Sequence, residues 1–160
     1  MTDILEILNS LNIEFQLQEH KAIFSEKDSR EVEILLPGIE VKNLFVKDKK
    51  SNYALVTLAL HDRADLKKIA LELGFERLSF CSAQELLSFL NITPGSVTPF
   101  CIMFDSERKV KFLLDENLKG KNVIVHPLRN TASVSISCSD LERFIEHYNH
   151  KVMTGSVCLL

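Results

Sequence analysis

The sequence predicts an α+β domain in which helices flank a mixed or antiparallel sheet. Amphipathic helical patterns lie toward both ends of the chain, and short β-rich stretches cluster between residues 100 and 137. Successive strand patterns also follow one another without an intervening helix. A doubly wound fold would alternate strands with helices, so these observations favour the α+β class.

Length and composition bound the class of protein. The chain has 160 residues, of which 46% are hydrophobic and 26% charged, and this suits a single domain spanning residues 1–160. No run approaches the roughly 18 apolar residues of a membrane span. The first residues are acidic and lack an early Lys or Arg, unlike a signal peptide. We therefore expect a cytoplasmic protein with no membrane partner.

The first half of the chain shows alternating helix and strand signals. Helical spacing begins at Ile4, and a strand is expected over 15–19. Ser25 and Asp28 resemble a capping box for a helix that stops before Pro37. Two β-rich stretches, 41–46 and 53–60, are joined by the polar turn "KDKKSN" and predict a hairpin. A helix is expected over 64–73, ending at Gly74, and a short strand over 77–80.

The second half is bounded by two helix starts. Ser82 with Glu85 and Ser139 with Glu142 match the S-x-x-E capping pattern, and their helices are expected to end near Leu90 and Tyr148. Four strand-like stretches lie between them, at 100–104, 109–114, 122–126 and 132–137.

Charge and side-chain chemistry exclude several function classes. The net charge of −3 argues against a protein coated with positive charge, although "KNLFVKDKK" gathers Lys42, Lys47, Lys49 and Lys50 in a basic segment that an ordinary solvated surface would also explain. Glycine-rich nucleotide loops, G-x-S-x-G and H-E-x-x-H are missing. The four cysteines are widely spaced and predict free thiols, and His147 with His150 fits a helix end better than a metal site.

Two loops hold more polar groups than a plain chain reversal requires. In "ITPGSVTPF", Gly95 and Pro99 frame Ser96, Val97 and Thr98, whose successive N–H groups could bind an oxyanion, a phosphate or a water. In "VIVHPLRNTASVSI", His126 and Pro127 precede Asn130 and Thr131. Each stretch taken alone is also compatible with an ordinary turn.

Taken together and in order, "KNLFVKDKKSNYALV", "LNITPGSVTPF", "VIVHPLRNTASVSI" and "SDLERFIEHYNH" resemble the YbaK/ProX family of aminoacyl-tRNA editing domains. Within that family the sequence is most similar to the free-standing prolyl-tRNA editing proteins of the ProXp-ala type. The resemblance covers nearly the whole chain. It implies a mixed, barrel-like sheet flanked by helices, and hydrolysis of the ester of mischarged tRNA, typically alanine on the tRNA for proline.

The resemblance also implies a set of site residues. The family's lysine falls on Lys42, its G-x-x-x-P loop on Gly95 to Pro99, and its His-Pro pair on His126 and Pro127. Asn130 and Thr131 match the polar residues after that pair, and Lys47 is expected to assist in substrate binding. Cys101, Phe104 and Ser133 depart from the family pattern, which leaves the preferred amino acid open among alanine, serine, cysteine and other small residues.

The mechanism implied is electrostatic rather than covalent. Because no Ser-His-Asp or Cys-His arrangement is evident, we expect water as the nucleophile, donors of the Gly95–Pro99 loop at the oxyanion, and Lys42 in a positioning role. No metal or cofactor is implied. The implied partner is mischarged tRNA, and prolyl-tRNA synthetase is a candidate second partner. The alternative is a non-catalytic module that binds a tRNA acceptor end or an aminoacyl ligand, and the oligomeric state is open.

Overall fold

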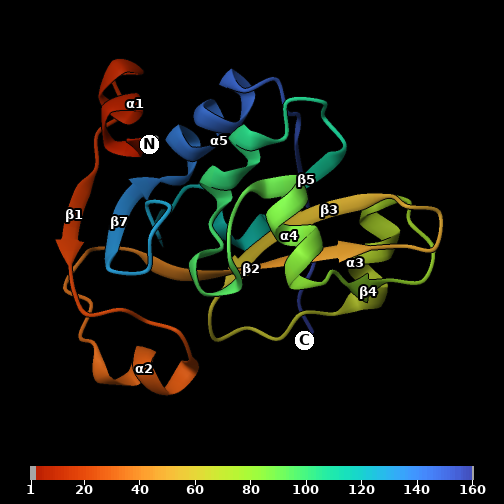
Figure 1. Cartoon of the computed structure of the whole chain (residues 1–160), viewed down its shortest axis with the longest axis horizontal. Helices are drawn as coiled ribbons and strands as arrows, with labels where there is room; N and C mark the ends of the chain where they lie inside the picture. The colour runs from red at the N-terminus through yellow and green to blue at the C-terminus, as the bar shows by residue number, and fades with distance from the viewer. Residues whose placement is uncertain (1–2, 160) are drawn as a thin grey trace.

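A computed structural model describes residues 3–159 of the chain (Figure 1). Its α-helices are α1 (Ile4–Ser10), α2 (Glu26–Glu31), α3 (Leu66–Leu73), α4 (Ala83–Leu90) and α5 (Cys138–His147). Its strands are β1 (Gln16–Glu19), β2 (Ile39–Lys47), β3 (Tyr53–Ala59), β4 (Ser79–Phe80), β5 (Val110–Asp115), β6 (Asn122–Val125), β7 (Ala132–Ser137) and β8 (Val152–Gly155). Three 3₁₀ helices are η1 (Pro94–Ser96), η2 (Pro99–Phe104) and η3 (Glu116–Leu118).

The strands form one mixed sheet in which β2 is the central element. The order is β1-β7-β6-β2-β3-β5-β8, with β4 paired to β2 outside this path. The first two residues of β2 pair with β6 in parallel, and Val41–Lys47 pair with β3 in antiparallel. Figure 1 shows β2 and β3 crossing the middle of the molecule, with α1, β1 and β7 on one side and α3 and β4 on the other. This arrangement confirms a mixed sheet flanked by helices.

Several local predictions are confirmed because neighbouring residues determine them. The turn between β2 and β3 is held by Asp48, whose carboxylate accepts the backbone N–H of Lys50 and of Asn52. Gly74 ends α3 in the left-handed region at φ 70°, which glycine adopts without cost. Ser82 and Glu85 form the complete capping box of α4.

Other predictions are wrong, and each error has a physical cause. Residues 100–104 belong to the 3₁₀ helix η2 and do not form a strand. A short run of apolar residues has no polar–apolar periodicity that would distinguish a helix from a strand. Helix α5 begins at Cys138 with Ser137 as its cap, two residues before the predicted cap Ser139. Strand β8 was not predicted, whereas helix α2 ends at Glu31 and so stops before Pro37 as predicted.

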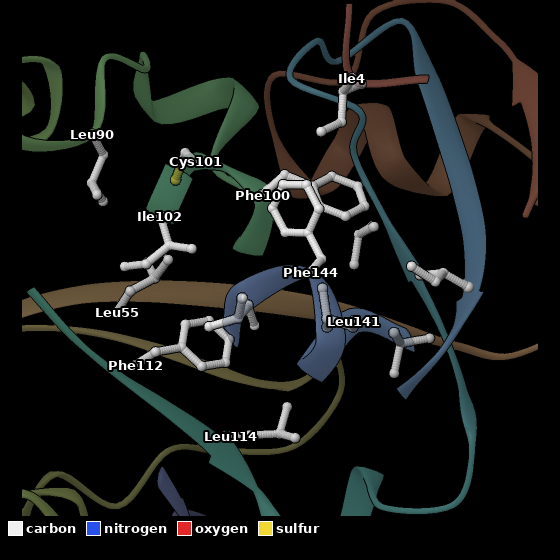
Figure 2. Close-up of a cluster of buried hydrophobic side chains, with 14 of the residues drawn as sticks. Ile4, Leu55, Leu90, Phe100, Cys101, Ile102, Phe112, Leu114, Leu141 and Phe144 are labelled. Carbon is white, nitrogen blue, oxygen red and sulfur yellow. The ribbon is translucent and has the colours of Figure 1, made fainter. Parts of the chain in front are cut away.

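The core lies on both faces of the sheet. The larger cluster joins the sheet to α1, α4, η2 and α5, and the smaller cluster joins it to α3. Figure 2 shows Phe100, Cys101 and Ile102 of η2 directed into the larger cluster, where Phe100 packs edge-on to Phe144 with ring centroids 4.9 Å apart. Among residues 3–159, no helix combines the length and apolar character needed to cross a bilayer.

A buried polar pair ties the turn before β5 to the segment after α5. His150 Nε2 lies 2.9 Å from Asp105 Oδ2, and the same carboxylate accepts the backbone N–H of Lys109 and of Val110. Burial raises the pKa of Asp105, but these hydrogen bonds outweigh it and hold the pKa below the ordinary value of 3.8.

We therefore expect Asp105→Asn to destabilise the fold by about 2–3 kcal/mol, because the new amide NH₂ group would face N–H donors that now bind the carboxylate. Since the folded-state pKa of Asp105 is depressed, its contribution is present above pH 4 and is lost as the pH falls through that pKa. Urea unfolding at pH 7 and below pH 4 measures both effects. Glu107→Gln, which removes an exposed partner of Lys109, is the matched control and should change stability by less than about 1 kcal/mol.

Candidate active site

The two faces of β2 serve different purposes. Asn43 pairs with Thr57 of β3 and accepts its hydroxyl at 2.6 Å, and Phe45 on the same face packs in the larger core cluster. Side chains alternate along a strand, so Lys42 lies on the opposite face, beside the position of Leu58. Lys42 is half-buried there.

The parallel pairing of β2 with β6 orients Lys42 and His126 alike. Glu40 pairs with Ile124 at the end of this ladder, and Lys42 and His126 each follow two residues beyond that pair. Because side chains alternate along a strand, Lys42 is on the same face as Glu40, and His126 follows Ile124 in the same way. The structure therefore places these two predicted site residues just beyond the end of one ladder.

His126 presents one unoccupied ring nitrogen. Its Nδ1 donates to the carbonyl of Ala132 at 3.0 Å, so in the neutral imidazole Nε2 carries the lone pair. Nε2 makes no hydrogen bond with any residue from 3 to 159. Burial lowers the pKa of His126 below the ordinary 6.5, an effect that the hydrogen bond to Ala132 partly opposes, and the neutral form therefore dominates at pH 7.

His20 is a neighbour that sequence reasoning missed. Its ring lies edge-on to that of His126 with centroids 6.4 Å apart, its Nδ1 donates to the carbonyl of Lys21, and its Nε2 lies 2.9 Å from the hydroxyl of Ser133. The sequence offered no local partner for His20. The pairing of β1 with β7 creates these contacts, and no local signal reveals it.

The Gly95–Pro99 loop runs from within η1 to the first residue of η2 and offers fewer N–H donors than predicted. The N–H of Ser96 is occupied, because it donates to the carbonyl of Thr93 at 3.0 Å. Thr98 is fully buried, and its hydroxyl has no partner among the described residues. Gly95 and Val97 are half-buried, and their N–H groups donate to no acceptor within residues 3–159. The available donors are therefore those of Gly95 and Val97, instead of Ser96 to Thr98.

The loop contacts the elements that carry the other site residues. Asn43 Nδ2 donates to the carbonyl of Val97 at 3.4 Å, which connects the loop to β2. A Cβ placed on Gly95 would lie 3.4 Å from the ring of Phe24 and 3.7 Å from Asn130 Nδ2. The loop thus meets both the segment after β1 and the turn between β6 and β7. Asn43 is the second residue that sequence reasoning missed.

The remaining predicted substrate ligands are occupied within the fold. Asn130 is buried, and its amide donates to the carbonyl of Ile23 at 3.1 Å. The hydroxyl of Thr131 accepts from Arg129 at 2.8 Å, and Pro127 is buried in the turn. These residues shape the turn that holds His126.

Lys47 forms an ion pair within the fold. Its ammonium lies 2.8 and 2.9 Å from the two carboxylate oxygens of Glu85 on α4, and it faces the side of β2 opposite Lys42. Tyr53 donates to the same carboxylate at 3.1 Å. The hydrogen bond from Lys47 lowers the pKa of Glu85 to about 2, so this ion pair engages Lys47 within the fold, and its role in substrate binding stays a prediction.

The four cysteines are free, and none is suited to act as a nucleophile. Burial raises the pKa of Cys81, Cys101 and Cys158 to about 12 and that of Cys138 to about 11. At neutral pH a thiol with such a pKa is protonated and unreactive.

Two other features lie outside these contacts. Asp62, Asp115 and Cys158 have potential metal-ligand atoms within 4.8 Å of one another, but they include no residue of the predicted site. A hollow of about 560 Å³ lies between α2 and the adjoining ends of β2 and β3, and it is lined in part by Arg30, Glu40 and Ile124. It adjoins the face that carries Lys42 and His126.

Comparisons with known proteins give a consistent result. The family model "Aminoacyl-tRNA editing domain" matches residues 23–144, which include Lys42, the loop and His126. The prolyl-tRNA editing protein ProX of Acetoanaerobium sticklandii is 33% identical over 89% of this chain and 88% of its own. The prolyl-tRNA synthetase associated domain-containing protein 1 of Danio rerio is 35% identical over 92% and 82% of the two chains.

A solved structure supports the fold. It is that of a provisionally assigned trans-editing enzyme for prolyl tRNA synthetase, and it aligns with a TM-score of 0.70 at 17% identity over 100% of this chain and 99% of that one. At this identity the likeness concerns the fold alone.

The space beside Gly95 gives a stability prediction. Gly95 has no positive φ and an added methyl group would make ordinary contacts, so Gly95→Ala should change the free energy of unfolding by less than about 1 kcal/mol. Gly38→Ala is the contrast, because Gly38 has φ 130° and its Cβ would lie 2.7 Å from the carbonyl oxygen of Asn122. We expect that change to cost about 2 kcal/mol or more in urea unfolding. Equal losses in the two variants would contradict the geometry.

Proposed function

Because the chain belongs to the aminoacyl-tRNA editing domain family, and is therefore a hydrolase that deacylates aminoacyl-tRNA, we propose that it acts in trans on alanyl-tRNA for proline. It would clear errors made by prolyl-tRNA synthetase in the cytoplasm, with that enzyme as a candidate partner. The relatives named for prolyl-tRNA editing and for association with prolyl-tRNA synthetase support this choice of substrate.

One observation carries the proposal: three segments distant in sequence meet around β2. The loop with the N–H groups of Gly95 and Val97 is bonded to Asn43 of β2 and contacts the turn that follows His126. Lys42 precedes Asn43 in β2 and places its side chain on the other face of the strand. A cation, two N–H donors and an acceptor nitrogen are the groups that an ester-hydrolysing site needs.

The proposed mechanism uses water as the nucleophile. The N–H groups of Gly95 and Val97 would stabilise the oxyanion of the tetrahedral intermediate, and such a donor is worth roughly 2.7–4 kcal/mol where one has been removed elsewhere. His126 Nε2 accepts a hydrogen bond from the attacking water or from the terminal ribose hydroxyl. Lys42 positions the substrate by its charge, next to the terminal phosphate or the aminoacyl end.

Release of labelled alanine from alanyl-tRNA for proline by the purified protein tests the function. Free alanine that accumulates with turnover supports a deacylase. Tight binding that leaves the ester intact would instead support the non-catalytic alternative. A panel with serine and cysteine on the same tRNA measures the preference among small residues, where one methylene group is worth about 1–3 kcal/mol.

Lys42→Ala should lower kcat/KM for alanine release roughly a hundredfold while the melting temperature stays unchanged, because its ammonium serves the substrate and not the core. Lys42→Arg should restore little activity, since a forked guanidinium does not reproduce a point charge. Lys49→Ala is the control, because Lys49 is an exposed residue of the β2–β3 turn. Wild-type rates in a folded Lys42→Ala protein would remove Lys42 from the site.

Gly95→Ala should lower the turnover per folded molecule about a hundredfold, although the free protein has room for the methyl group. The methyl group would occupy the space through which the substrate carbonyl approaches the backbone, and a displacement of about 1 Å can have an effect of this size. Turnover and melting temperature are measured on one sample. Unchanged turnover would show that the loop is an ordinary connection.

The rate should also depend on the protonation of His126. Since its pKa is lowered, the neutral form persists at and somewhat below pH 6.5, and kcat/KM should fall only at lower pH, where Nε2 becomes protonated. His126→Gln retains an acceptor atom that does not titrate, so its acid limb should disappear. An unchanged acid limb in His126→Gln would assign the titration to another group. Rates without protein are subtracted at each pH.

A further inference from the structure

Phe24 is an aromatic residue left exposed beside the site. It lies between β1 and α2 and exposes 74% of its surface, whereas Phe45, Phe100, Phe112 and Phe144 are buried. Single exposed apolar residues are common and need no explanation of their own. What distinguishes Phe24 is its position, because its ring edge lies 3.4 Å from where a Cβ of Gly95 would be.

The backbone that carries this ring is fixed on both sides. The N–H of Ile23 donates to the carbonyl of Asn130, and Asn130 Nδ2 donates back to the carbonyl of Ile23, both at 3.1 Å. The N–H of Phe24 donates to Asp28 Oδ2 at 3.1 Å, within the first turn of α2. An exposed ring on an anchored backbone is preorganised to receive a flat partner, because little backbone freedom remains to be lost on binding.

We propose that Phe24 is the platform on which the terminal base of the tRNA acceptor end stacks. This inference rests on the proposed function. The terminal nucleotide carries both the base and the aminoacyl ester, so a base on Phe24 lies within one nucleotide of the Gly95 and Val97 donors. Aromatic side chains stack on unpaired bases, and each such contact is worth about 1–3 kcal/mol.

The charges next to Phe24 suit the same ligand. Lys27 and Arg30 are exposed on α2, immediately after Phe24, and neither is engaged in an ion pair among the described residues. Helix α2 also contains three acidic residues, so Lys27 and Arg30 serve as individual contacts for phosphate groups and do not make the helix positive. Asp28 accepts the N–H of Phe24.

Stacking can be measured without any chemical step. An uncharged RNA acceptor minihelix with 2-aminopurine in place of the terminal adenine is titrated with the protein, because this base loses fluorescence when it stacks. The wild-type protein should quench the signal. Phe24→Leu keeps an apolar side chain but removes the aromatic face, so it should bind about tenfold more weakly and quench little. Phe24→Trp should retain both properties.

Leu35→Ala is the matched control, since Leu35 exposes 75% of its surface in the segment after α2. It should quench as the wild type does. A second minihelix carries 2-aminopurine at the penultimate position, and a stronger quench there would overturn the assignment to the terminal base. Equal quenching by Phe24→Leu and wild type, or no binding of the minihelix by wild type, would also overturn the proposal.

Kinetics separate this inference from the proposed function. In alanine release, Phe24→Leu should raise KM about tenfold with little change in kcat, because the platform holds the substrate and does not touch the reacting bond. Unchanged KM with normal wild-type turnover would refute the platform and leave the deacylase intact. Quenching by wild type without alanine release would refute the proposed substrate and leave the platform intact.

Discussion

Burial of η2 in the core is the constraint on which the site depends. Phe100, Cys101 and Ile102 are fully buried between the sheet, α4 and α5, and the Cys101 thiol donates to the carbonyl of Thr98 at 2.8 Å. This fixes the end of the Gly95–Pro99 loop. The other end follows α4, which stops at Asn91 in the left-handed conformation. A loop held at both ends can present N–H groups in advance of the reaction, which is the condition for effective oxyanion stabilisation.

Strand β2 meets two demands through the alternation of its side chains. One face carries Asn43, Phe45 and Lys47, which bond to the loop, the core and α4. The other face carries Lys42, which can serve a substrate without weakening those contacts. Lys42 and Lys47 look alike in a basic segment of sequence. Their separation by an odd number of residues, five, places their side chains on opposite faces of β2. Lys47 meets Glu85 on its face, whereas Lys42 has a different environment on the other face.

Features that depend on residues close in the sequence could be predicted, whereas side-chain roles that depend on residues far apart in the sequence could not. The β2–β3 hairpin, the Gly74 helix end and the Ser82 capping box depend on contacts within a few residues. The role of Lys47 depends on Glu85, and that of His20 depends on Ser133, both brought together only by tertiary pairing. The apolar run 100–104 was misassigned because burial hides its period. The assignment of Lys42 and His126 came from family resemblance and not from spacing.

The chemistry of the proposed site suits an ester. The four thiols are protonated at neutral pH, and the acceptor nitrogen of His126 is a weak base because burial lowers its pKa. A stable amide would require a stronger nucleophile or a better base. An aminoacyl ester is already activated, so positioning of water and polarisation of one carbonyl are sufficient. In the proposed site, weak groups in fixed positions would therefore give selectivity for the ester as well as catalysis, because they would leave the far more abundant peptide bonds intact.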